Sequence, residues 1–118
     1  MGAAIGSMLT RSGLDIITPL DGRTNLTHSR AEESGMRDVR NVRALVLEAD
    51  IVLSVLVPSQ AEFIADSVIE AMGVTGRRPT FVECNAIAPQ TARRIGARVT
   101  AAGAIFIDAG IIGTPPKP

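Results

Sequence analysis

The chain has 118 residues, with 12 lysines and arginines against 12 aspartates and glutamates, and 46 % of its residues are apolar. This length corresponds to one domain, and the apolar fraction excludes an intrinsically disordered segment. A net charge of zero gives no electrostatic reason to expect a nucleic-acid partner. No run approaches the roughly 18 apolar residues of a membrane-spanning helix, so we expect no membrane partner. The single cysteine, Cys84, cannot form an internal disulfide, which favours a cytoplasmic protein.

Helical and strand-like segments alternate along the chain. Apolar residues at helical spacing, with proline or capping residues before them and glycine after most of them, predict the helices. They cover residues 3–12, 24–34, 42–49, 58–72 and 89–102, with Gly13, Gly35, Gly73 and Gly103 as stops. Short β-branched runs predict strands at residues 15–18, 50–57, 80–84 and 104–108.

The strand-like runs are almost continuously apolar, as in parallel strands that helices cover on both faces. Their alternation with helices predicts an α/β fold: a doubly wound, Rossmann-like parallel sheet. Such a sheet normally begins with a strand that leads into the first helix, and no strand precedes the helix at residue 3. We therefore expect a partial domain over residues 1–118 that lacks the first strand.

The first candidate site residues lie where this fold binds dinucleotides. Gly2 is placed to let the first helix pack closely on the sheet, with phosphates at the helix N-terminus. The alternative is an ordinary small packing residue. After the first strand, Asp21 is suited to the ribose hydroxyls of NAD, whereas Arg23 and Thr24 are suited to the 2′-phosphate of NADP. The alternative for this segment is a type I or type II turn with Thr24 as a helix cap.

The second group of candidates follows two later strands. Leu56, Val57 and Pro58 connect the strand at 50–57 to the next helix, which is the edge of the sheet where ligands bind. The alternative is an ordinary turn with proline at the first helical position. Asn85 follows the strand at 80–84, and its amide can donate to or accept from a ribose or a carbonyl. Its alternative role is to bind turn backbone.

The last strand leads into Gly110 and Gly113, which allow close approach of the backbone to a ligand, or serve as turn glycines. Cys84 is interpreted as a small buried apolar residue and His28 as an exposed residue without a chemical role. The arginines are assigned to solvated surfaces. One cysteine and one histidine do not make a zinc site, so no metal site is expected.

In combination, these segments resemble the β-hydroxyacid dehydrogenase family of 3-hydroxyisobutyrate and 6-phosphogluconate dehydrogenases. The resemblance covers the whole chain in order. The matching segments are Met1-Gly2 (the last pair of a Gly-x-Gly-x-x-Gly loop), Gly22-Arg23-Thr24, Leu56-Val57-Pro58, Glu83-Cys84-Asn85-Ala86-Ile87-Ala88-Pro89 and Asp108-Ala109-Gly110-Ile111-Ile112-Gly113.

The resemblance implies a fragment of an oxidoreductase that moves a hydride between NADP or NAD and a small hydroxy acid. It implies cofactor contacts at Met1, Gly2, Arg23, Thr24, Leu56, Val57, Pro58 and Asn85, and substrate contacts at Gly110, Gly113 and Thr114. Ile112 and Ala86 depart from the serine and threonine common in the family, which puts a hydroxyisobutyrate-type substrate in doubt.

The resemblance also sets what the chain lacks. The catalytic lysine of the family lies in a later helix, so Lys117 is given no role and no catalytic residue is assigned. The helical C-terminal domain, which usually forms a homo-oligomer in the complete enzyme, is expected to be absent. A non-catalytic nucleotide-binding or interaction module is the alternative function. A receiver-type domain fits less well, because only Asp108 lies at the carboxyl end of a strand.

Overall fold

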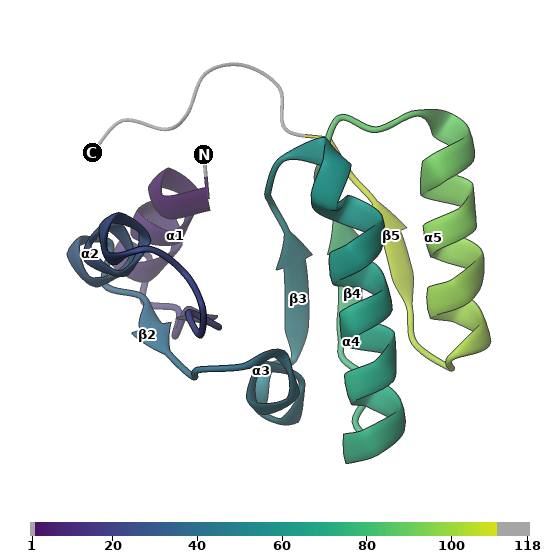
Figure 1. Cartoon of the computed structure of the whole chain (residues 1–118), viewed down its shortest axis with the longest axis horizontal. Coiled ribbons are helices and arrows are strands. Elements are labelled where there is room, and N and C mark those ends of the chain that lie inside the picture. The colour runs from purple at the N-terminus through teal and green to yellow at the C-terminus, as the bar shows by residue number, and fades with distance from the viewer. Residues whose placement is uncertain (1, 111–118) are drawn as a thin grey trace.

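The computed structural model describes residues 2–110, in which helices and short strands alternate (Figure 1). The helices are α1 (Gly2–Arg11), α2 (Asn25–Glu33), α3 (Val42–Glu48), the 3-10 helix η1 (Pro58–Gln60), α4 (Ala61–Thr75) and α5 (Pro89–Ala101). The strands are β1 (Ile17–Thr18), β2 (Arg37–Asp38), β3 (Ile51–Ser54), β4 (Thr80–Glu83) and β5 (Phe106–Asp108). No helix in this part of the chain is long and apolar enough to cross a membrane.

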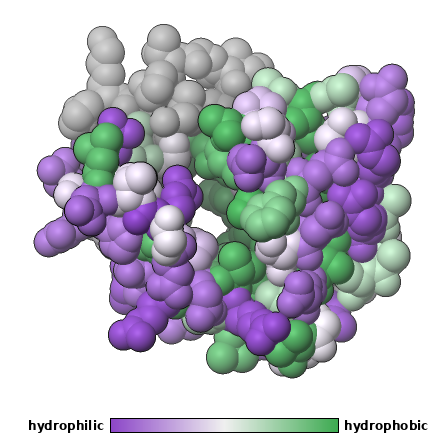
Figure 2. Space-filling model, in the orientation of Figure 1, coloured by the Kyte–Doolittle hydropathy of each residue, from purple (hydrophilic) through white to green (hydrophobic). Residues whose placement is uncertain are grey.

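All strand pairs are parallel, as the sequence predicts. Strands β1 and β2 form one small sheet, and β3, β4 and β5 form a second sheet in that order. In space, β2 and α2 lie apart from β3 (Figure 1), and Figure 2 shows an opening between these two parts of the molecule. Within residues 2–110 no strand connects the two sheets, so both keep unpaired strands.

The core lies between the larger sheet and the helices α3, α4 and α5. In register across this face, Val52 pairs with Phe81 and Phe81 with Phe106, and the two phenylalanine rings stack with centroids 6.2 Å apart. The helices contribute small and aliphatic side chains that are almost completely buried: Val46, Ala61, Ala65, Val68, Ala71, Met72, Ile95 and Val99. An aliphatic core is what the low aromatic content requires.

The opposite face of this sheet is exposed, and the prediction that its strands are covered on both faces is wrong for residues 2–110. Ile51, Leu53 and Ile107 are 60 %, 43 % and 47 % exposed. Their neighbours along the same strands, such as Val52, are buried because α4 and α5 pack on that side only. Within the described part of the chain, the larger sheet therefore has a row of apolar side chains that no helix covers.

Helix ends show where local signals decide the structure. Thr24 caps α2 through its Oγ1, which accepts from the Thr27 N–H at 3.2 Å, as expected for a threonine at that position. Gly73, expected to end its helix, lies inside α4. The helix continues to Gly76, whose φ of 76° is the left-handed conformation that glycine adopts at a helix end.

Strand β2 was not predicted, because its two residues are polar and exposed. It is held by pairing rather than by burial. Arg37 pairs with Ile17 in the backbone register, and its guanidinium forms salt bridges with Asp15 and Glu48. A strand fixed by such contacts has no hydrophobic pattern for the sequence to show.

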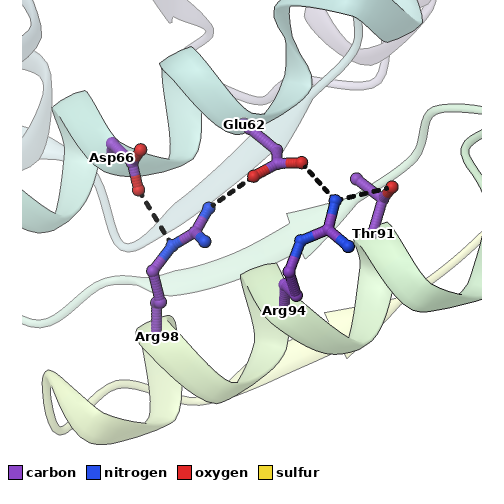
Figure 3. Close-up of polar contacts among 5 residues, drawn as sticks. All are labelled: Glu62, Asp66, Thr91, Arg94 and Arg98. Carbon is purple, nitrogen blue, oxygen red and sulfur yellow. Dashed lines mark hydrogen bonds and ion pairs between the residues drawn. The ribbon is translucent and has the colours of Figure 1, made fainter.

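Helices α4 and α5 are joined on their solvent side by a charged network (Figure 3). Glu62 accepts from Arg94 at 2.7 Å and from Arg98 at 3.2 Å, and Arg98 also lies 2.9 Å from Asp66. Hydrogen bonds from Arg94 and then Arg98 lower the pKa of Glu62. Arg94 is exposed, as expected for a solvated surface, but Arg94 and Arg98 also have structural partners that the sequence did not predict.

Candidate functional site

The carboxyl end of β3 leads into the turn that the sequence assigns to the cofactor. Leu56 and Val57 follow the strand, and Pro58 begins η1. Val57 has extended backbone and is 61 % exposed, while its carbonyl accepts from the Gln60 N–H at 3.0 Å. The turn thus carries an accessible side chain on a backbone that its hydrogen bonds hold in place.

Asn85 holds this turn from the neighbouring strand. Its Oδ1 accepts from the Leu56 N–H at 2.8 Å. Its Nδ2 donates to Glu83 Oε1 at 2.6 Å and to Ser54 Oγ at 3.0 Å. These contacts correspond to the alternative role of Asn85, in which its amide binds turn backbone. Both N–H donors of the amide and one of the acceptor positions on its oxygen are used by neighbouring protein groups.

Glu83 is the most unusual side chain at this edge. It is completely buried in β4, and its Oε1 accepts from the backbone and side-chain N–H groups of Asn85. Its Oε2 is buried without a hydrogen-bond partner among the described residues. Burial is the main cause that raises the pKa of Glu83, and the charge of Asp108 on β5 adds to it.

The segment after β1 forms a compact loop. The Arg23 N–H donates to the Leu20 carbonyl at 3.0 Å, and Gly22 has a φ of 77° while Asp21 has a negative φ. This pattern is the type II turn among the alternatives stated for the segment. The turn leaves Arg23 exposed, and no salt bridge within residues 2–110 includes it.

Three contacts fix this loop to its surroundings. The Leu20 N–H donates to Asp38 Oδ1 at 3.2 Å, and the Asp21 N–H donates to the Arg40 carbonyl at 2.8 Å. His28 Nε2 lies 3.0 Å from the Leu20 carbonyl oxygen. His28 is exposed as expected, but it has a role that was not expected, because it ties α2 to the loop.

Helix α1 begins beside the β3 turn. A Cβ on Gly2 would lie 3.5 Å from the Val55 carbonyl oxygen, which is ordinary van der Waals contact. Helix α1 therefore begins in contact with the β3 turn, but at a distance where an alanine would also fit, so the structure does not require glycine here. In Figure 1 the start of α1 is level with the carboxyl end of β3. In doubly wound folds a helix runs antiparallel to the neighbouring strands, so we expect the N-terminus of α1 and the loop after β1 to lie at one edge of the fold.

The candidate residues fall into two groups. Gly2 lies at the β3 turn with Leu56, Val57, Pro58 and Asn85, whereas Arg23 and Thr24 lie in the loop after β1. Gly110 is exposed just beyond β5. Met1, Gly113 and Thr114 lie outside the described residues, as do Ile112 and Lys117.

Other features of the surface lie away from these groups. An open groove of about 310 Å³ lies beside β2 and α3, and a second groove, of about 330 Å³, lies between α5 and β5. Neither groove is lined by the predicted cofactor residues. No group of three or more potential metal ligands occurs among residues 2–110. Burial raises the pKa of the Cys84 thiol, which keeps it in the unreactive form.

Residues 1–117 match the family of the NAD-binding domain of 6-phosphogluconate dehydrogenase. The chain belongs to this family. No curated protein sequence matches it.

Several solved structures are similar to this member of the NAD-binding family. One is MTH1747, a conserved protein of unknown function with structural similarity to 3-hydroxyacid dehydrogenases. It shows 27 % identity and a TM-score of 0.78 over 95 % of this chain and 40 % of its own. Another is Mycobacterium tuberculosis 3-hydroxyisobutyrate dehydrogenase with L-serine, with 24 % identity and a TM-score of 0.79 over 96 % of this chain and 38 % of its own.

A third is an oxidoreductase of Mycobacterium avium 104, with 20 % identity and a TM-score of 0.74 over 98 % of this chain and 40 % of its own. The two matches below 25 % identity establish the fold only. The chain spans about 40 % of the length of these structures. The α/β Rossmann-like fold and the resemblance to hydroxyacid dehydrogenases are therefore confirmed.

Sequence reasoning missed the side chains that support the site in this NAD-binding domain. The sequence indicates Glu83 only as part of a motif, and it indicates no role in the loop for Asp38 or His28. A glutamate inside an apolar strand two residues before an asparagine was a usable signal, because a buried carboxylate needs donors close by. The contacts of Asp38 and His28 depend on β2 and on the loop geometry, for which the sequence has no pattern.

Proposed function

We propose that the 118 residues form the dinucleotide-binding part of an NAD(P)-dependent oxidoreductase that acts on a small hydroxy acid. The observation that carries the proposal is the family match over residues 1–117, joined to the approach of Gly2 to the β3 turn. The dinucleotide supplies the hydride chemistry, and the protein binds and orients it. The substrate class is supported by MTH1747, which shares 27 % identity and is structurally similar to 3-hydroxyacid dehydrogenases.

The residues present fit a nicotinamide dinucleotide. The exposed guanidinium of Arg23 is a free cation for a phosphate, and the first turn of the ten-residue helix α1 offers backbone N–H groups to another. In this proposal, Arg23 and Thr24 bind the adenosine side. Leu56, Val57 and Pro58 bind along the β3 turn, with Met1 and Gly2 at the phosphates. Asn85 contributes through the turn that it holds.

The preference between NADP and NAD rests on two neighbouring side chains. If Arg23 binds a 2′-phosphate, Arg23→Gln weakens NADP binding and leaves NAD binding unchanged. If Asp21 binds the ribose hydroxyls, Asp21→Asn weakens NAD binding instead. Arg77→Gln is the matched control, because Arg77 is an exposed arginine that follows α4 and precedes β4, at the opposite edge of the sheet.

Binding is measured by chemical-shift titration of the isotope-labelled chain with each dinucleotide. We expect affinity weaker than micromolar, because none of the 118 residues forms a Gly-x-Gly-x-x-Gly loop for the pyrophosphate. Equal responses of Arg23→Gln, Asp21→Asn and Arg77→Gln would contradict the assignment of the loop after β1 to the adenosine.

The remaining parts of the proposal concern the complete enzyme. Substrate contacts are assigned to Gly110, Gly113 and Thr114 by the family motif that begins at Asp108. The complete enzyme is proposed to be a cytoplasmic homo-oligomer, with its acid–base residue supplied outside these 118 residues. A non-catalytic binding module of the same fold is the alternative, and hydride transfer by the complete protein separates the two.

A further inference from the structure

The amide of Asn85 has one orientation that satisfies its neighbours. Its Nδ2 faces two acceptors, Glu83 Oε1 and Ser54 Oγ, and its Oδ1 faces one donor, the Leu56 N–H. In the reversed orientation, Nδ2 would face the Leu56 N–H and Oδ1 would face Glu83 Oε1. Donor would then meet donor and acceptor would meet acceptor, at a partly buried position where such mismatches are costly.

Glu83, which accepts from Nδ2, and the Leu56 N–H, which donates to Oδ1, together select this orientation. The Glu83 Oε1 lies 2.6 Å from Asn85 Nδ2 and 3.3 Å from the Asn85 backbone nitrogen, so one oxygen accepts from both the side-chain and the backbone N–H of Asn85. Ser54 alone would not select it, because a hydroxyl donates as readily as it accepts. Oε1 accepts whether the carboxyl group is protonated or ionised, so the arrangement persists across the neutral pH range.

The burial of Glu83 makes a purely structural explanation incomplete. Among residues 2–110, no cation is a hydrogen-bond partner of Glu83, and its Oε2 is buried without a partner. A leucine of similar size would fill the same space without desolvating a carboxyl group. The polar contacts of Glu83 are with Asn85 and with Ser54, which itself accepts from Asn85. We therefore explain this buried carboxyl group by what it does to Asn85.

We propose that Glu83 is a positioning residue: by orienting the Asn85 amide across the sheet, it holds the Leu56–Val57–Pro58 turn in the form that meets the dinucleotide. The inference rests on the proposed function for the identity of the ligand. The link from Glu83 through Asn85 to Leu56 stands on geometry alone. Glu83 on β4 holds the Asn85 amide, and the amide oxygen of Asn85 accepts from the backbone N–H of Leu56 in the β3 turn. In the proposal, that turn then contacts the ligand.

Hydrogen exchange of the Leu56 amide tests the link, because its N–H donates to Asn85 Oδ1. In Glu83→Leu we expect Leu56 protection to fall about tenfold, equivalent to about 1.4 kcal/mol. The Phe81 amide, which donates to the Ile105 carbonyl, is expected to keep its protection. In Glu83→Gln, the amide oxygen replaces the lost acceptor, so Leu56 protection stays within about threefold of the original chain.

Unchanged Leu56 protection in Glu83→Leu would overturn the inference, as would an equal loss at Phe81. If Glu83→Leu does not fold, the original chain still gives an answer. The Asn85 Nδ2 protons are then expected to exchange at least about tenfold more slowly than those of the exposed Asn25. Equal exchange at the two side chains would refute the fixed orientation.

The same variants separate this inference from the proposed function. A dinucleotide titration of Glu83→Leu is expected to show weaker binding, with Glu83→Gln restoring it, if both proposals are right. If exchange at Leu56 depends on Glu83 but neither NADP nor NAD binds to the original chain, the proposed function fails while the link remains. If dinucleotide binding is unaffected by Glu83→Leu although Leu56 protection falls, the positioning role fails.

Discussion

Two glycines inside helices provide a matched test of the packing between α5 and the sheet. A Cβ on Gly96 of α5 would lie 2.9 Å from Cδ2 and Cε2 of the Phe106 ring, whereas a Cβ on Gly73 of α4 would meet nothing within 4 Å. Because Phe106 also stacks on Phe81, its ring has little room to move away. The same change, glycine to alanine, is therefore expected to have opposite effects at the two positions.

Replacing glycine by alanine inside a helix stabilises it by about 0.8–1 kcal/mol. Gly73→Ala is expected to gain about that amount. Gly96→Ala gains the same helix propensity, but overpacking against the Phe106 ring costs about 1–3 kcal/mol, so its free energy of unfolding is expected to fall by about 1 kcal/mol. The two variants should then differ by about 2 kcal/mol, or roughly 8 °C in melting temperature for a domain of this size.

Urea and thermal unfolding of both variants measure this difference. Adding Phe106→Leu to Gly96→Ala removes the ring edge and should recover most of the loss, which a double-mutant cycle detects as coupling. If Gly96→Ala stabilises the chain as much as Gly73→Ala does, the close contact between α5 and β5 is refuted.

Three further outcomes follow from burial and charge. Burial raises the pKa of Glu83 above its ordinary 4.5, so its contribution to the free energy of unfolding is present in full below that pH and is expected to fall as the pH rises toward the folded pKa, by at most about 1.4 kcal/mol per pH unit. Urea midpoints measured against pH should give a flatter profile for Glu83→Gln, and equal profiles for the two proteins would count against this effect of burial. The exposed apolar face of the larger sheet predicts self-association, so Leu53→Lys should lower the apparent mass measured by light scattering. Val74→Lys, at an exposed valine on α4, is the control and should lower the mass less. Equal masses for the two variants would contradict association through the sheet face. Glu62→Gln should lower the melting temperature at low salt and much less in about 1 M salt, where charges are screened, and a loss that salt does not change would exclude the ion pairs as its cause.

The elements that bury a pattern of apolar side chains were predictable from the sequence. Helix α5 has its stripe of buried residues at helical spacing between Pro89 and Gly103, and the structure places it there. Helix α4 was predicted with the wrong end. Gly73 looked like a stop, but an exposed glycine with free space around it is tolerated inside a helix, at some cost in stability.

Contacts between distant segments were not predictable. The link of Asn85 to Leu56 spans 29 positions, and that of Leu20 to Asp38 spans 18. Both depend on strand pairing that brings the segments together, and neither changes the local pattern of the chain. The sequence thus indicated Leu56 and Asn85 as separate candidates, whereas the fold joins them through one hydrogen bond.

The central claim is that a nicotinamide dinucleotide binds at the edge formed by the loop after β1, the start of α1 and the β3 turn. Chemical-shift titration of the full chain with NADP and with NAD tests it most directly, because it detects millimolar binding and locates it. The account predicts shifts in the amides of Arg23, Thr24, Leu56 and Val57, and none at Arg94 on the outer face of α5. Shifts confined to other surfaces, or none with either dinucleotide, would contradict it.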